Sequence, residues 1–298
     1  MNELKISVVT ACYNQASTIE RTVKSVLGQN YPNLEYIVMD GASPDATLEI
    51  LNHYQEGIAK LISEPDSGQY HAIQKGLSMA TGDVMAWLNG DDLYYPWTFK
   101  LVNRIFTDFP TVDWVIGLPS FVEENDVAYK ISSQMAGYPR EWIKNGWYSE
   151  KLGGFLQQES MFWRKSLWDK SAQLDTSLRL AADFKLWTEF AKHAELTSVS
   201  VPLSMFRTLP GIQRSSAQRD VYNHEVELVC KGLVRPPHLW RYLSDKGLVA
   251  RSLVRWFLYA SAPYVAYNRS GRNWQFKRGV LPISRAGLAE LFLENSLR

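Results

Sequence analysis

Cysteines are few in this sequence, and its histidines are not clustered. The two cysteines, Cys12 and Cys230, lie far apart, and none of the five histidines stands three or four residues from another. A disulfide framework needs more cysteines, and a zinc site needs ligands at short spacings, so neither is expected. The cysteine usage is consistent with a reducing, cytoplasmic compartment.

Long apolar stretches and the common phosphate-binding loops are also missing. No run of eighteen apolar residues occurs among the 298 residues, whereas a membrane-spanning helix needs about twenty. The chain enters a strand pattern directly after residue 5, which argues against a secretory signal peptide. No G-x-G-x-x-G follows the first strand, and no G-x-x-x-x-G-K-[ST] is present, so a dinucleotide-binding or P-loop protein is not expected.

Charge is distributed unevenly along an otherwise ordinary globular composition. The chain is 46% hydrophobic and 21% charged, and its length suits one large domain with an appendage. Residues 231–298 hold twelve Lys and Arg against three Asp and Glu, a net charge of +9, which leaves −8 for the first 230 residues. We therefore predict an acidic body over residues 1–230 and a basic extension over residues 231–298.

Strand and helix patterns alternate through the first hundred residues. Apolar runs at residues 5–10, 34–40, 61–62 and 84–88 predict strands. Between them, apolar residues recur at helical spacing, for example Ile73, Leu77 and Ala80 before Gly82. The alternation predicts an α/β fold whose parallel strands are joined by right-handed crossovers.

Acidic residues follow three of the predicted strands. Asp40 closes the second strand, Glu64 and Asp66 follow the third, and Asp91 and Asp92 follow the fourth. In open α/β sheets, ligands bind beyond the carboxyl ends of the strands. Adjacent carboxylates repel each other unless a cation offsets their charge, which favours Mg²⁺ or Mn²⁺ at this edge. The plainer alternative is a solvated turn that caps the next helix.

A further carboxylate precedes an apolar helical stripe. Asp183 comes just before Leu186, Trp187 and Phe190, which share one helical face. At a helix N-terminus the dipole favours the ionised form, so Asp183 is a candidate to accept a proton. Capping of the helix is the alternative.

Five segments in this order resemble glycosyltransferase family 2, whose fold is called GT-A. They are VVTACYN at 8–14, YIVMDGASPDAT at 36–47, SEPDSGQYHAIQKGL at 63–77, ATGDVMAWLNGDD at 80–92 and LAADFKLW at 180–187. The resemblance covers roughly the first 210 residues. It implies a Rossmann-like, mostly parallel sheet flanked by helices, with a nucleotide-binding half over 1–110 and an acceptor-binding half over 111–230. The basic extension is expected to be helical.

The resemblance also implies roles for matching positions. The nucleotide-binding residues would be Thr10, Tyr13, Asn14, Asp40, Glu64, Asp66 and Asp91, with Asp40 accepting a hydrogen bond from the base imide. Asp92 would hold the metal against the diphosphate, and Asp183 would be the general base. Gln158 would contact the acceptor, in place of a His found in related sequences. Arg207 would border a mobile loop near the diphosphate, whose glycines are here reduced to Gly211.

The resulting hypothesis is an inverting, metal-dependent hexosyltransferase. It would move a sugar from a nucleotide diphosphate sugar to a hydroxyl of a glycan or lipid-linked acceptor. UDP-sugars are the favoured donors because Asp40 suits an imide, although dTDP-sugars present the same edge. Metal would stabilise the leaving diphosphate, and one carboxylate would deprotonate the acceptor, unlike the two flanking acids of a hydrolase. Assembly of surface polysaccharide or O-antigen follows from the resemblance alone.

Two alternatives remain open at this point. A sugar nucleotidyltransferase uses a similar sheet, but the glycine-rich basic loop that would follow its first strand is missing here. A catalytically silent module that binds nucleotide sugars would not need both Asp92 and Asp183.

Aromatic and basic residues interleave from residue 236 onward. Residues 248–259 fit an amphipathic helix with Arg251 and Arg255 one turn apart. The extension could place the enzyme at the inner face of the cell membrane, pack on the catalytic domain or form a homodimer interface. Binding to nucleic acid is the least favoured of these hypotheses.

Overall fold

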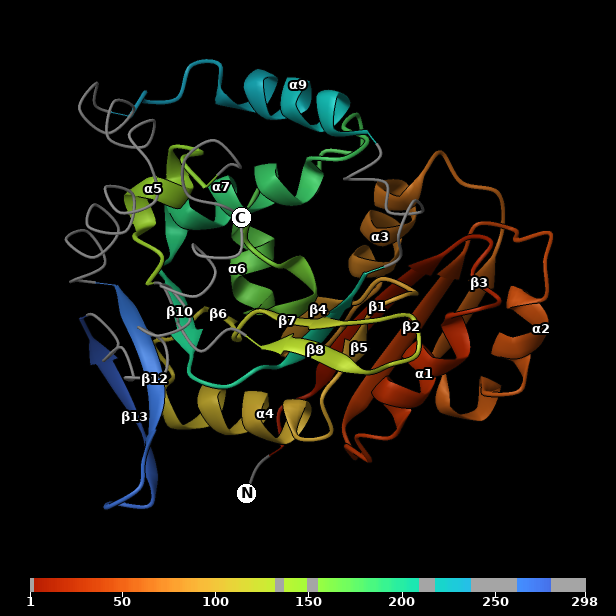
Figure 1. Ribbon diagram of the computed structural model, residues 1–298, viewed down its shortest axis with the longest axis horizontal. Helices are drawn as coiled ribbons and strands as arrows, with labels where there is room; N and C mark the ends of the chain where they lie inside the picture. Colours follow the sequence, from red (N-terminus) through yellow and green to blue (C-terminus); the bar gives the residue numbers. More distant parts are fainter. Residues whose placement is uncertain (1–2, 132–136, 149–154, 209–217, 237–261, 280–298) are drawn as a thin grey trace.

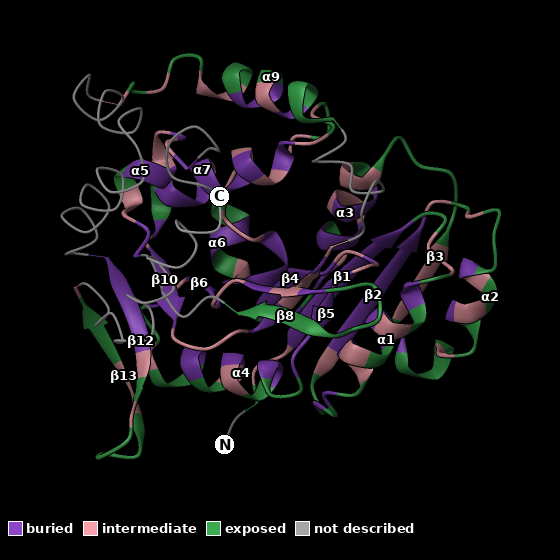
Figure 2. Ribbon diagram, in the orientation of Figure 1, coloured by how far each residue is buried: buried purple, intermediate pink, exposed green. Residues whose placement is uncertain are grey.

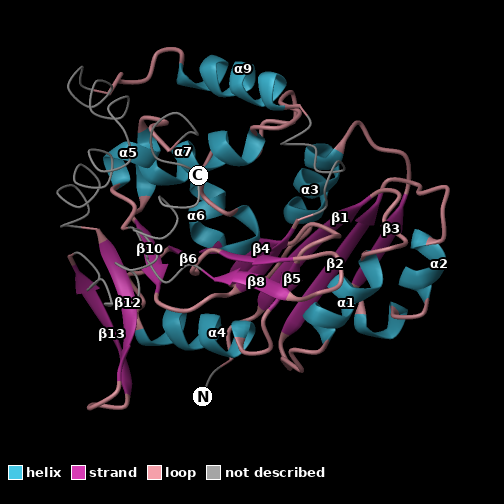
Figure 3. Ribbon diagram, viewed as in Figure 1, coloured by secondary structure: helices cyan, strands magenta, loops and turns pink. Residues whose placement is uncertain are grey.

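A sheet of nine strands forms the middle layer of the protein, with helices packed on both faces (Figures 1 and 3). The computed structural model describes residues 3–131, 137–148, 155–208, 218–236 and 262–279. From edge to edge the strands are β3 (Lys60–Ser63), β2 (Leu34–Asp40), β1 (Ile6–Cys12), β4 (Val84–Trp87), β9 (Met161–Arg164), β6 (Trp114–Ile116), β10 (Leu196–Val199), β12 (Pro263–Asn268) and β13 (Asn273–Arg278). All run parallel except β9 and β13. The predicted α/β fold with a mostly parallel sheet is confirmed.

Four short strands form a second sheet. Their order is β5 (Leu93–Tyr94), β11 (Ser204–Arg207), β7 (Ser120–Val122) and β8 (Ala128–Ile131). β5 follows the loop that leaves β4, and β11 ends at Arg207. The small sheet therefore borders the end of β4, where the paired aspartates lie.

The helices divide between the two faces of the large sheet. One face carries α1 (Ile19–Leu27), α2 (Thr47–Asn52) and α4 (Thr98–Asp108), with the short η1 (Gln55–Gly57) after α2. The other carries α3 (Gln69–Ser78), α5 (Arg140–Lys144), α6 (Lys165–Lys170) and α7 (Ala182–His193). α9 (Arg219–Cys230) packs on α7, away from the sheet, and η2 (Gln158–Ser160) leads into β9.

Side chains of the central strands are buried on both faces, which is why these strands appear as continuous apolar runs (Figure 2). In β1, Val8 packs toward the α1 side and Val9 toward the α3 side. Gly76 lets α3 approach β1 closely, because a Cβ there would lie 2.5 Å from Val9 Cγ1. The helix and strand positions therefore follow from burial of both faces of the sheet.

A cluster of buried tryptophans fills the core between the sheet and α7. Trp87 at the end of β4 stacks on Trp187 of α7, with ring centroids 5.7 Å apart and an interplanar angle of 16°. Trp163 of β9 contacts both rings edge-on, at 5.8 Å and 5.9 Å. Each large ring removes a wide apolar surface from water, so this cluster holds α7 firmly on the sheet.

The basic extension differs from the expected helix where it is described. Residues 263–278 form the antiparallel hairpin β12–β13, and β12 continues the large sheet beside β10. Apolar and polar residues alternate over Asn273–Lys277 of β13, and the turn between the strands contains Gly271. This is the pattern of a hairpin rather than a helix. The predicted amphipathic helix at 248–259 lies outside the described residues.

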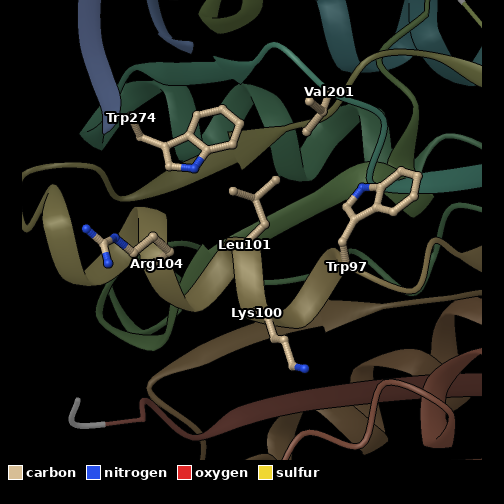
Figure 4. A pocket seen from close by; sticks show the side chains of 6 residues that line it. All are labelled: Trp97, Lys100, Leu101, Arg104, Val201 and Trp274. Carbon is tan, nitrogen blue, oxygen red and sulfur yellow. The ribbon is translucent and has the colours of Figure 1, made fainter. Parts of the chain in front are cut away.

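A shallow hollow lies between the hairpin and α4. It is lined by Trp97, Lys100, Leu101, Arg104, Val201 and Trp274. Figure 4 shows Leu101 between the two indole rings.

Among the described ranges, no helix is long and apolar enough to cross a bilayer.

Replacement of Trp163 by Ala should lower the free energy of unfolding by about 3–5 kcal/mol, because loss of a buried indole leaves a cavity. Urea denaturation followed by circular dichroism measures the change. Trp97→Ala is the control, since that ring is 45% exposed, and it should cost less than half as much. Equal losses for the two variants would contradict the role assigned to the tryptophan cluster.

Candidate active site

The first three parallel strands end level with one another. In the sheet register, Cys12 pairs with Asp40, and Asp40 pairs with Ser63. β4 ends at Trp87, and residues 89–92 form the turn that follows it. The predicted acidic residues on these loops therefore belong to one edge of the sheet, called the rim below.

Asp40 is held rigidly at the rim by its neighbours. Its side chain is almost completely buried. One carboxylate oxygen accepts the hydroxyl of Ser63 at 2.5 Å, and the other accepts the hydroxyl of Ser43 at 2.5 Å. The Ser43 backbone N–H also donates to this carboxylate, at 3.1 Å. Donors on both oxygens fix the orientation of the carboxylate.

Tyr13, Asp40 and Asp66 come together around Gly41. A Cβ at Gly41 would lie 2.9 Å from the Asp66 carboxylate and 3.3 Å from the Tyr13 ring. The Tyr13 ring is 49% exposed, so it offers a flat aromatic face to solvent beside two acids. Asn14 follows with a positive φ of 56°, and its N–H donates to Ser43 Oγ at 3.0 Å. The first two rim loops are thus joined.

Two of the predicted nucleotide-binding residues do not point to this place. Thr10 is completely buried, and its hydroxyl accepts the Tyr36 hydroxyl at 3.1 Å inside the core. Glu64 is exposed and pairs with Lys75 of α3. The structure therefore groups Tyr13, Asn14, Asp40 and Asp66 but leaves the side chains of Thr10 and Glu64 outside the group.

Asp92 is a buried carboxylate at the end of β4. Its side chain accepts the Arg207 N–H at 3.0 Å and the Asn89 side-chain amide at 3.3 Å. Burial raises the pKa of Asp92 well above its ordinary value, and the nearby charges of Asp91 and Glu159 raise it further. The ionised form of Asp92 is therefore favoured only when positive charge is nearby.

Arg207, expected to border a mobile loop, is itself held in a strand. It is the last residue of β11 and is completely buried. Its guanidinium donates to the carbonyl oxygen of Asp91 at 2.7 Å and to that of Glu124 at 2.9 Å, and it forms an ion pair with Asp126 at 2.5 Å. Arg207 thus fixes the main chain of the paired aspartates. Gly211 lies outside the described residues.

Glu159 is a rim carboxylate that the sequence analysis missed. It lies in η2, beside Gln158, whose side-chain amide donates to the Trp87 carbonyl at 2.6 Å. Only 3% of Glu159 is exposed, and its Oε1 has no hydrogen-bond partner. Burial raises the pKa of Glu159 to about 8, and the charges of Asp91 and Asp183 contribute in the same direction. Because β9 runs antiparallel, residues before this strand reach the rim that the parallel strands reach at their ends.

Asp183 lies near the N-terminus of α7, as predicted, and is the second residue of that helix. Its Oδ1 accepts the Phe184 N–H at 2.7 Å and lies 3.1 Å from the Tyr70 hydroxyl. The side chain is half-buried, and burial raises its pKa to about 6. A carboxylate with this pKa is ionised at neutral pH and still basic enough to accept a proton.

The separate parts of the rim are in contact with one another. A Cβ at Gly90 would lie 3.1 Å from Cys12 Cβ, so the loop after β4 touches the end of β1. Gln69 at the start of α3 donates to Asn89 at 2.8 Å. Tyr70, the next residue of α3, donates to Asp183 Oδ1 at 3.1 Å. Asp40, Asp92 and Asp183 thus lie along one continuous rim.

A divalent cation fits the paired aspartates only with help from other ligands. In the part of the chain that the structure describes, no group of three or more His, Cys, Asp or Glu side chains could hold a metal ion. The unpartnered oxygen of Glu159 and the like charges around Asp92 nevertheless favour a cation there. Mg²⁺ is commonly bound by one or two carboxylates together with phosphate oxygens, which suits this arrangement.

Similar proteins are glycosyltransferases. An uncharacterized glycosyltransferase of Mycobacterium tuberculosis is 39% identical over 90 residues, which are 30% of this chain and 34% of that protein. The putative teichuronic acid biosynthesis glycosyltransferase TuaG of Bacillus subtilis is 41% identical over 90 residues, covering 29% and 36% of the two chains. The aligned stretch thus spans about a third of these relatives. An uncharacterized glycosyltransferase of Haemophilus influenzae aligns over 82% of this chain and 76% of its own length, at 25% identity.

Solved structures share the fold. Staphylococcus aureus TarS in complex with UDP-GlcNAc matches with a TM-score of 0.62 and 18% identity, over 85% of this chain and 73% of that one. Mannosyltransferase PcManGT from Pyrobaculum calidifontis, in complex with GDP-Man and Mn²⁺, matches with a TM-score of 0.57 and 18% identity, over 100% and 81%. These likenesses confirm the GT-A fold.

The family model described as "Glycosyl transferase family 2" matches residues 7–169, more than half of the chain. This stretch includes the rim loops after β1, β2, β3 and β4 and the η2 turn, and it ends before Asp183. The chain belongs to glycosyltransferase family 2.

Proposed function

We propose that this protein is an inverting, metal-dependent glycosyltransferase that moves a sugar, of the hexose type, from a UDP-sugar to an acceptor hydroxyl. The observation that carries the proposal is the placement of one basic carboxylate, Asp183, along the same rim as the paired Asp91 and Asp92. Tyr70 of α3 contacts Asp183, and its neighbour Gln69 contacts Asn89 in the turn that holds the pair. A single-displacement transfer needs one positioned base opposite the leaving group.

The nucleoside would bind where Tyr13, Asp40 and Asp66 meet. The exposed Tyr13 ring can stack on a base. Asp40, oriented by Ser43 and Ser63, is proposed to accept a hydrogen bond from the imide N–H of uracil. Asn14 and Asp91 would border the ribose. A dTDP-sugar presents the same imide and is the second candidate donor.

Asp92 would hold Mg²⁺ or Mn²⁺ together with the donor diphosphate. When bound, the ion supplies positive charge that stabilises the negative charge developing on the leaving diphosphate. Arg207 supports this arrangement because its N–H orients the Asp92 carboxylate and its guanidinium fixes the Asp91 carbonyl.

Asp183 would accept the proton of the acceptor hydroxyl. The hydroxyl oxygen then attacks the anomeric carbon as the bond to the diphosphate breaks on the opposite face, so the configuration inverts. Tyr70 and the Phe184 N–H hold the Asp183 oxygen that they contact, leaving the other oxygen for the acceptor. Gln158, which lies beside Glu159 in η2, is proposed to contact the acceptor.

Two alternative functions are separated by their products. A sugar nucleotidyltransferase would release pyrophosphate, and a non-catalytic module would bind a nucleotide sugar without turnover. The family match favours the glycosyltransferase over both. A panel of UDP- and dTDP-sugars, assayed with Mn²⁺ for release of nucleoside diphosphate, distinguishes the three functions.

Asp183→Asn should lower turnover of the best UDP-sugar by about 10²–10⁴-fold, because it removes the general base. Donor binding, measured by calorimetry with Mn²⁺, should stay within about 2-fold, since Asp183 would not touch the donor nucleotide. Asp92→Asn is the matched variant, and it should instead weaken the Mn²⁺-dependent part of donor binding. Full transfer activity in Asp183→Asn would remove Asp183 from the mechanism.

The pH dependence of turnover follows from the same carboxylate. Asp183 must be ionised to accept a proton, and its pKa is raised to about 6. Below that pH the protonated form dominates, so kcat should fall about tenfold per pH unit on the acid side and level off above it. Steady-state rates between pH 4.5 and 8 at saturating donor measure this profile. An acid limb centred near pH 4 would contradict the raised pKa.

The acceptor is proposed to be a glycan or a lipid-linked sugar, with a role in surface polysaccharide or O-antigen assembly. One relative, TuaG, is named for teichuronic acid biosynthesis. Peripheral attachment at the inner face of the membrane is supported by the hairpin β12–β13, where Arg269, Arg272 and Lys277 are exposed. The indole rings of Trp97 and Trp274 lie close by (Figure 4), and such rings favour the lipid headgroup region.

Replacing Arg269, Arg272 and Lys277 together by Gln should weaken binding to anionic vesicles, because each basic residue near the surface contributes about 1 kcal/mol. Flotation with phosphatidylglycerol vesicles measures binding, and phosphatidylcholine vesicles are the control. Equal flotation of variant and parent would refute a role for the hairpin.

Sedimentation velocity on the same samples tests homodimerisation, the other proposed use of the extension.

A further inference from the structure

Helix α9 brings a buried carboxylate to the start of the helix that carries Asp183. α9 packs on α7 (Figure 1), with Tyr222 and Val226 in one cluster with Phe184, and Glu225 is buried between them in the sequence. Glu225 is only 7% exposed. Charged side chains are rarely buried without partners that offset the loss of water, so its contacts indicate what it does.

Glu225 accepts three hydrogen bonds from consecutive backbone N–H groups. One oxygen accepts Arg179 N–H at 2.8 Å. The other accepts Leu180 N–H at 2.8 Å and Ala181 N–H at 2.9 Å. These residues immediately precede α7, in which Asp183 is the second residue. A carboxylate with three N–H donors is strongly held, and it holds the donors in turn.

The start of α7 has no capping side chain of its own. Its N-cap residue is Ala181, which makes no side-chain hydrogen bond. Ser, Thr, Asp or Asn is usual at this position because the first N–H groups of a helix need acceptors. Here the chain that enters the helix is fixed by Glu225 from a different element, about forty residues later in the sequence.

Tyr70 of α3 also holds this short segment. Its hydroxyl in α3 lies 3.0 Å from the Leu180 carbonyl oxygen and 3.1 Å from Asp183 Oδ1. The segment 179–181 is thus fixed by its N–H groups to α9 and by a carbonyl to α3. Both contacts set the position of the Asp183 carboxylate at the rim.

We propose that Glu225 is a positioning residue for Asp183, fixing residues 179–181 so that the base faces the acceptor hydroxyl. Glu225 would not touch the substrate. The inference rests on the proposed function, because it gives Glu225 a part in the same transfer reaction.

Glu225 also adds negative charge near the base. Titratable groups from three elements interact electrostatically with Asp183. They are Tyr70 from α3, Glu159 from η2, and Tyr222 and Glu225 from α9. Burial is the main reason that the pKa of Asp183 is raised, and the charge of Glu225 acts in the same direction. Removal of that charge should make Asp183 a weaker base as well as a less ordered one.

Glu225→Gln tests the proposal in the full chain. It keeps the size of the side chain but removes the charge and turns one acceptor into a donor, so at least one N–H contact is lost. Turnover is measured as UDP release from the most active UDP-sugar, with water as acceptor. We expect kcat to fall about 10–100-fold, since small misplacement of a catalytic group has effects of this size. The KM for the donor should change less than about 2-fold, and the acid limb should move to lower pH.

Glu227→Gln is the matched control, because it removes the same charge from an exposed position on the same helix. It should leave kcat and the pH profile unchanged. Glu225→Asp is the second variant. It keeps the charge but is one methylene shorter, so kcat should fall while the acid limb stays in place.

The outcomes separate this inference from the proposed function. If Asp183→Asn is inactive while both Glu225 variants have parental kcat values, Glu225 does not position the base and the inference is overturned. If Asp183→Asn retains activity, the proposed mechanism itself fails. If a Glu225 variant loses donor affinity and kcat to the same extent, its role is only to support the fold, which also overturns the inference.

Discussion

The stacking of Trp87 on Trp187 is the contact on which the geometry of the rim depends. Trp87 is the last residue of β4, four positions before Asp91, and Trp187 lies one helical turn after Asp183. The two rings therefore join the strand that leads to the paired aspartates to the helix that carries Asp183, the proposed base. The rings are buried, and Trp163 packs against both. The distance between the end of β4 and α7 is therefore set by the rigid core rather than by a loop.

The rim brings several carboxyl groups close together, and backbone N–H groups orient some of them. The charges of Asp91 and Glu159 help to raise the pKa of Asp92, and those of Asp91 and Asp183 help to raise the pKa of Glu159. Arg207 N–H, Phe184 N–H and the donors to Glu225 hold individual carboxylates in place. Donors of this kind orient the acids but do not remove their repulsion. A bound cation would reduce this repulsion, so the arrangement suits the proposed metal-associated diphosphate.

Much of this arrangement could be predicted from the sequence. Alternation of strands and helices gave the parallel sheet, and the positions of Asp40, Asp91 and Asp92 followed from the rule that ligands bind at strand carboxyl ends. Glu159 was not predicted, because it precedes a strand that runs in the opposite direction and an apolar run does not reveal strand direction. The side chain of Thr10 points into the core, since alternation within a strand decides its orientation. The burial of Arg207 could not be predicted, because two of its partners are main-chain carbonyl oxygens, which no sequence pattern marks.

The hairpin at the end of the sheet has a consequence for how these molecules behave in concentrated solution. Among the described residues β13 pairs only with β12, so its outer side presents free backbone groups to which a strand of another molecule could add. Lys277 and Arg278 are exposed on this strand, and Arg278 is paired with Glu195. If the β13 edges of two molecules came together, their basic side chains would repel each other and would lose bound water. The strand thereby resists the open-ended joining of sheets that leads to aggregation.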